Sequence, residues 1–163
     1  MSRIAVRIEE PMVGVSESGI RKAVAYTLQQ ESADLNLSVA VVDDAKIREL
    51  NLRYLNHDFA TDVISFDLRN HEAKSDADVE IDLEGKSESE REEHWDAEIV
   101  VSATTAQREA ALRGLDPCSE LFLYCVHGTL HLLGYDDHDE QDQRRMHQRQ
   151  AEILRGLGFE TQS

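Results

Sequence analysis

Residues 116–138 read DPCSELFLYCVHGTLHLLGYDDH. Asp116 and Pro117 are typical of a helix start, with the aspartate as the N-cap and the proline in the first turn. The residues that follow are apolar on nearly every side, which predicts a central and buried helix. Gly134 is expected to end this helix in a left-handed conformation.

Two histidines of this helix, His127 and His131, are four residues apart, so their imidazoles project from one face. A single histidine in an apolar helix is more often a hydrogen-bonded core residue. The pair at helical spacing, followed by a glycine and a third histidine, favours a metal site instead. We predict that Zn²⁺ is bound by His127, His131 and His138, with Asp137 as the alternative third ligand. Three protein ligands leave a position for water, which is typical of catalytic zinc.

Gly128 lies inside the predicted helix, where glycine costs about 1 kcal/mol relative to alanine. Either a substrate or backbone that approaches the metal face closely, or tight packing of the helix, would explain it. Gly128 also stands where zinc peptidases of the H-E-x-x-H type carry their glutamate base. A zinc hydrolase acting on peptides or other substrates is therefore the weaker alternative.

Outside this helix, strands and helices alternate with turn and capping residues. Apolar alternation or β-rich runs predict strands at 4–8, 37–42, 63–68 and 97–102, and helical periodicity predicts helices at about 19–30, from 43 or 44 onward, from 102 or 104 to 114, and at about 140–157. We predict one α+β domain over 1–163, in which an about four-stranded mixed sheet packs with helices and the metal site lies on the buried central helix. The acidic residues 70–95 are expected to form an exposed, mobile insertion.

The composition limits the protein class. The chain has 163 residues and a formal net charge of -16, which argues against nonspecific binding to nucleic acid, although four arginines between 141 and 155 leave room for a local basic surface. No segment approaches the length of a membrane span, and charges at Arg3 and Arg7 argue against a signal peptide. Cys118 and Cys125 are expected to be free thiols in a reducing cytoplasm.

The segment from His127 to Asp136, HGTLHLLGYD, resembles the signature of the YbeY family of metal-dependent endoribonucleases. Two other regions are similar to family motifs: Leu50–Tyr54 with Thr61–Phe66, and Glu98–Ser102, which carries glutamate where the family usually has aspartate. The resemblance runs from about residue 4 to 158 and leaves out the acidic insertion.

This resemblance implies a single α+β domain with a zinc ion held by three histidines in a cleft. It implies cleavage of single-stranded RNA, and a role in 3′-end maturation of 16S ribosomal RNA and in ribosome quality control. Single-stranded RNA, ribosomal RNA and the small ribosomal subunit are the expected partners.

The sequence departs from the family pattern at two positions. Asp137 stands where the third histidine of the family usually falls. The next residue, His138, would therefore reach the metal only through a one-residue bulge in the turn. Leu55 replaces the arginine that follows the tyrosine of the second motif and is thought to engage RNA phosphate. Arg53 and His57 are the nearby candidates for that contact, and Asp136 is a candidate for orienting a ligand histidine. Arg53 and Asp136 are the predicted catalytic residues.

The missing arginine and the acidic charge favour one further hypothesis. In it the protein is a ribosome-assembly factor whose metal is mainly structural.

Overall fold

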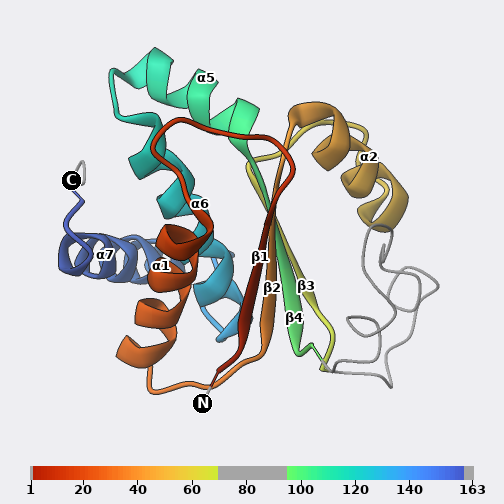
Figure 1. The fold of residues 1–163 in the computed structure, drawn as a ribbon. Helices are drawn as coiled ribbons and strands as arrows, with labels where there is room; N and C mark the ends of the chain where they lie inside the picture. Colours follow the sequence, from red (N-terminus) through yellow and green to blue (C-terminus); the bar gives the residue numbers. More distant parts are fainter. Residues whose placement is uncertain (1, 70–94, 160–163) are drawn as a thin grey trace.

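The computed structural model describes residues 2–69 and 95–159. Within them, β1 (Ile4–Ile8), β2 (Leu37–Val42), β4 (Ala97–Ser102) and β3 (Val63–Asp67) form one sheet in that spatial order (Figure 1). β1 is parallel to β2 and β2 is parallel to β4, whereas β3 runs antiparallel to β4. The predicted four-stranded mixed sheet is confirmed.

Five helices in the described residues each begin with a side chain that accepts a hydrogen bond from a backbone N–H of the first turn. They are α1 (Glu17–Gln30, capped by Ser16), α2 (Asp44–Leu55, capped by Asp43), α5 (Ala103–Arg113, capped by Ser102), α6 (Pro117–Leu132, capped by Asp116) and α7 (Glu140–Gly156, capped by Asp139). Because these caps are local, short-range patterns located the helix starts within about two residues.

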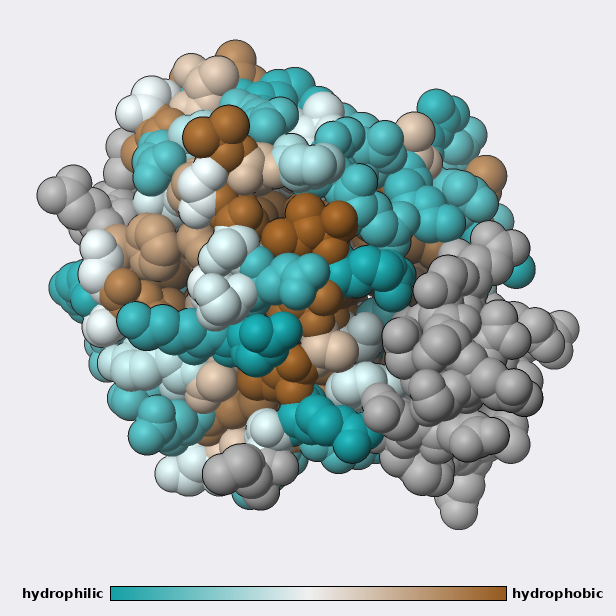
Figure 2. Space-filling view, viewed as in Figure 1, coloured by the Kyte–Doolittle hydropathy of each residue, from teal (hydrophilic) through white to brown (hydrophobic). Residues whose placement is uncertain are grey.

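The sheet is covered on both faces. α1, α6 and α7 lie over one face, and α2 lies over the other (Figure 1). The two central strands therefore bury both sets of alternating side chains: Val39 and Ile99 point to the larger core, and Ala40 and Val100 to the smaller one. On the side shown in Figure 2, hydrophilic residues dominate the surface over α2, and hydrophobic residues gather toward the centre.

α6 is the central helix, as predicted. It contacts α1, α5 and α7 as well as β3 and β4. At Gly128 it comes so close to the sheet that an added Cβ would lie 3.0 Å from Ser65 Oγ and 3.1 Å from the Val63 and Ile99 methyl carbons. Tight packing of the helix on the sheet thus accounts for the mid-helix glycine.

The predicted fold class, a single α+β domain with the two histidines on its buried helix, agrees with this structure. The predicted acidic insertion at 70–95 lies almost wholly outside the described residues. In the two described ranges, no helix has both the length and the hydropathy to span a bilayer.

Candidate metal centre

His127 and His131 lie on successive turns of α6, on the side that faces β3. Their ring centroids are 4.6 Å apart and the rings meet edge to face. Each histidine is half-buried, and one ligand nitrogen from each lies within 4.8 Å of the other and of a carboxylate oxygen of Asp137. Two imidazoles and a carboxylate are a donor set that zinc and other divalent transition metals accept. The residues present therefore fit the predicted ion.

A hydrogen bond to Gln150 on α7 orients the imidazole of His127. Nδ1 of His127 donates to Oε1 of Gln150, whose side chain is buried. Because a carbonyl oxygen only accepts, the proton resides on Nδ1 and leaves the Nε2 lone pair for a metal. Burial also lowers the pKa of His127 below its usual value, so the neutral form needed for coordination is favoured.

The third potential ligand lies in the turn after α6. Gly134 takes a left-handed φ of 103°, which turns the chain back beside the helix. This turn places Asp137, not His138, in the group of potential ligands. The His138 side chain is 85% exposed, and its Nδ1 lies 3.6 Å from Asp136 Oδ2. His138 as a ligand stays a prediction, with Asp137 the residue that this geometry favours.

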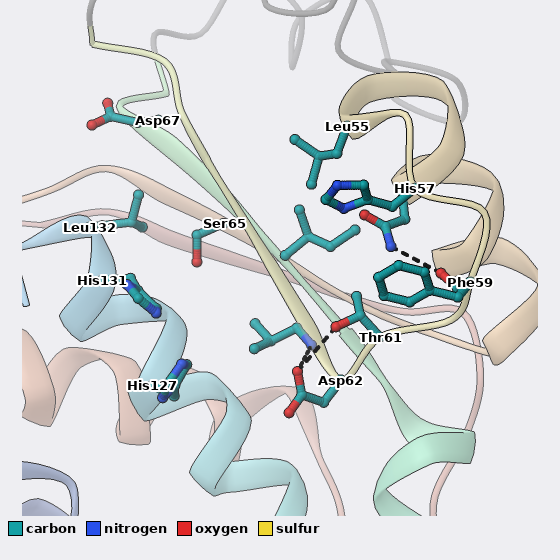
Figure 3. Close-up of a pocket in the computed structure, with 13 residues that line it drawn as sticks. Leu55, His57, Phe59, Thr61, Asp62, Ser65, Asp67, His127, His131 and Leu132 are labelled. Carbon is teal, nitrogen blue, oxygen red and sulfur yellow. Dashed lines mark hydrogen bonds between the residues drawn. The ribbon is translucent and has the colours of Figure 1, made fainter. Parts of the chain in front are cut away.

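The two histidines form one wall of a cleft of about 440 Å³ (Figure 3). β3 forms its floor, and the end of α2 with the following loop forms the opposite wall. The other described lining residues are Asn51, Leu55, His57, Phe59, Thr61, Asp62, Val63, Ile64, Ser65, Asp67 and Leu132.

Two polar residues link the floor to the surrounding elements. Ser65 Oγ donates to the Gly128 carbonyl oxygen at 3.1 Å, which joins β3 to the histidine-bearing turn of α6. Asp62 Oδ1 accepts from the Val63 N–H at 2.7 Å, and its carboxylate is directed toward His127 (Figure 3). Asp62 thus directly precedes β3 and lines the cleft.

Comparison with known proteins agrees with this site. Residues 7–158 match the family model described as "Endoribonuclease YbeY". The chain belongs to the YbeY family. It is 37% identical over 148 residues to endoribonuclease YbeY of Desulfitobacterium hafniense, covering 91% of this chain and 87% of that protein. It is 38% identical to endoribonuclease YbeY of Xylella fastidiosa (strain 9a5c), covering 85% and 78%.

The fold comparison agrees. The solution structure of TM1509 from Thermotoga maritima superposes with a TM-score of 0.61 at 22% identity, over 96% of this chain and 89% of that one. This likeness shows the fold, whereas the family match over residues 7–158 and the 37–38% identical relatives confirm the predicted resemblance to the YbeY family.

The two residues predicted to be catalytic lie away from the cleft lining. Arg53 is exposed, and its guanidinium carbon lies 5.2 Å from the ring centroid of Tyr54. Asp136 accepts a hydrogen bond from the His138 backbone N–H at 3.4 Å and lies 3.6 Å from Nδ1 of the His138 imidazole, and its carboxylate also interacts electrostatically with His131. Hydrogen bonding with Asp142 lowers the pKa of Asp136, with further help from the backbone N–H of His138. Of the YbeY-like second motif, the described lining includes Asn51, Leu55 and the start of β3.

Sequence reasoning missed Gln150 and Phe59. A buried glutamine beside Met146, Ile153 and Leu154 on the apolar face of α7 was the available signal for a polar partner. Phe59 was hidden in a short loop, where no periodicity marks a residue. His57, a candidate for the RNA contact, lines the cleft and is exposed.

Proposed function

We propose that this protein is a metal-dependent endoribonuclease that cleaves single-stranded RNA in the cleft between α6 and the end of α2. The observation that carries the proposal is the convergence of His127, His131 and Asp137 beside the cleft, in a chain of the YbeY family. From the family resemblance we further propose that it acts in the cytoplasm on the 3′ end of 16S ribosomal RNA in the small ribosomal subunit.

The ligand residues are proposed to be His127, His131 and one side chain of the turn after α6, with Zn²⁺ as the ion. A bound ion would supply Lewis-acid polarisation of the phosphodiester and an activated water. Gln150 holds the His127 ring in the tautomer that leaves Nε2 for coordination. Ser65 ties β3 to the histidine-bearing turn, so the floor of the cleft and the ligands are held in one arrangement.

Cleavage assays test the activity. The purified protein should cut single-stranded RNA and leave duplex RNA of the same sequence largely intact. A chelator should stop cleavage and added Zn²⁺ should restore it. His131→Ala should lose at least about 100-fold in rate because it removes a ligand. Intact single-stranded RNA after incubation with the Zn²⁺-loaded protein would refute the proposal.

Metal content identifies the third ligand. We expect Asp137→Ala to lose most of its bound metal and His138→Ala to retain it, because only Asp137 lies in the group of close donor atoms. Mass spectrometry of the two purified variants measures the number of ions per chain. The opposite pattern would assign the third position to His138.

A further inference from the structure

The cleft wall opposite the histidines carries two stacked rings that the metal chemistry does not use. The His57 and Phe59 rings have centroids 5.5 Å apart and an angle of 12° between their planes. Phe59 is 55% exposed although it is a large apolar residue. Both rings line the same cleft as His127 and His131, on its other side (Figure 3).

The loop that carries the rings is anchored by one buried residue. The side chain of Asn51 donates from Nδ2 to the Phe59 carbonyl oxygen at 3.0 Å. The backbone carbonyl oxygen of Asn51 accepts from the His57 N–H at 3.2 Å. Asn51 is 2% exposed, so this anchor is shielded from water. The backbone that carries the two rings is therefore held in place before any ligand arrives, which reduces the entropic cost of binding.

Charge indicates what the rings could bind. None of the described residues that line the cleft is lysine or arginine, Asp62 adds negative charge, and the charge of Asp67 is paired with Arg69 at 2.8 Å. Neutralisation of RNA phosphates by the lining side chains is therefore a poor source of affinity inside the cleft. Stacking on an aromatic ring is a source that needs no positive charge, and every nucleobase can take part in it.

We propose that His57 and Phe59 form a stacking platform for an unpaired nucleobase of the RNA strand whose phosphate lies at the metal centre. This proposal rests on the proposed function and adds the contact that selects the substrate. The bases of a duplex are already stacked and paired, so only a single strand can offer a base to the platform without the cost of unpairing. The platform would thus favour single strands and would tolerate different bases.

An abasic substrate isolates the stacking contact. We would compare a short single-stranded RNA with the same strand carrying an abasic nucleotide at successive positions, which keeps the phosphates and removes one base. Binding of the Zn²⁺-loaded protein is measured by fluorescence anisotropy on ice, and kcat and KM are measured by cleavage. For the wild type we expect about tenfold weaker binding with the abasic nucleotide at one position, within the roughly 5- to 150-fold range for a stacked base.

Variants of Phe59 connect that loss to the platform. Phe59→Leu keeps an apolar side chain without a ring, and should bind intact RNA about tenfold more weakly and show no further loss at the sensitive abasic position. Its KM should rise while kcat stays within about twofold of the wild type. Phe59→Trp should retain the affinity, and its indole fluorescence should be quenched by intact RNA relative to the wild-type signal.

Leu52→Ala is the matched control. Leu52 is 47% exposed on α2 but does not line the cleft, so its removal should leave RNA affinity unchanged. Unchanged affinity in Phe59→Leu, or equal wild-type affinity for every abasic strand, overturns the platform and assigns the exposed rings to another occupant such as a protein. If the wild type neither binds nor cleaves single-stranded RNA, the proposed function itself fails.

Discussion

At Gly128 a methyl group on α6 would meet side chains of the sheet at 3.0 to 3.1 Å, so these side chains would have to move by a few tenths of an ångström. Helix propensity alone would favour Gly128→Ala by about 1 kcal/mol. The contacts of 3.0 to 3.1 Å that the new Cβ would make with Ser65, Val63 and Ile99 oppose this gain. We expect a net loss of about 1–2 kcal/mol in the free energy of unfolding, measured by urea denaturation.

A second substitution provides the control for this prediction. Val63→Ala removes one of the two methyl contacts, so it should cost less stability in the Gly128→Ala background than in the wild type. If the stability losses of the two substitutions simply add, α6 and the sheet move apart to accept the methyl group without any cost from its contact with Val63. The sequence alone indicated that Gly128 needed a reason. The sequence did not show that this reason is close packing on the sheet, because Val63, whose side chain makes one of the contacts, is more than 60 residues away in the chain.

At the scale of elements, Asp44 joins α2 to β4 and α5. Its carboxylate accepts hydrogen bonds from Ser102 Oγ at 2.7 Å, Thr105 Oγ1 at 2.6 Å and Arg108 Nη1 at 2.7 Å. Burial by itself would raise the pKa of Asp44, but the hydrogen bonds from Arg108, Thr105 and Ser102 outweigh it, and the pKa is lowered. The stabilisation is therefore present above the unfolded pKa and is lost as the pH falls through the folded one.

Asp44→Asn tests this link between elements. At pH 7 the variant should be less stable than the wild type by about 1–2 kcal/mol. The difference should shrink as the pH falls below about 4, because the unfolded chain takes up the proton first and the folded carboxylate, whose pKa is lowered, takes it up at a lower pH. Denaturant unfolding at several pH values measures it, and the exposed Glu140→Gln serves as a control that should change little. A difference that is constant with pH would contradict the charge-based explanation.

The elements themselves could be predicted because their signals are local. Ser16 and Asp116 mark helix starts within a few residues. Alternation along β1 and the β-rich runs of β2 and β4 mark strands. The pairing of Gln150 with His127 could not be predicted, because it depends on how α7 packs on α6. For the same reason the sequence left the third ligand open, since a one-residue difference in a turn decides which side chain faces the metal.

For the whole molecule, the two hydrophobic cores determine how much the fold would depend on the proposed metal ion. Both cores are built from strands and helices that pack without the ligand atoms. Removing the ion should therefore leave the fold in place and lower Tm by roughly 5–10 °C, which corresponds to about 2.7 kcal/mol for an ion at 100 times its Kd.

Calorimetry and far-ultraviolet circular dichroism, with chelator and after Zn²⁺ is restored, measure this effect. Helical signal should persist at 25 °C in the chelated protein. Cooperative loss of that signal on chelation would instead indicate a mainly structural metal, the alternative in which the protein acts as an assembly factor. At this scale the sequence predicted the fold class and the histidine pair. The sequence could not show that Phe59 lies opposite the two histidines, because their relative position depends on how α2 and α6 pack on opposite faces of the sheet.

The antiparallel pairing of β3 with β4 has a further consequence. Asp67 is paired with Ala97, so the chain leaves the sheet and re-enters it at neighbouring points. The entropic contribution to the free energy of closing such a connection grows only with the logarithm of its length, by about 0.6 kcal/mol for each doubling. This corner can therefore accept sequences of very different lengths at little cost to the fold. It is accordingly a suitable position for inserting a reporter domain or an affinity tag, as long as Asp67, which lines the cleft, and Arg69, which donates to the Leu132 carbonyl oxygen of α6, are kept.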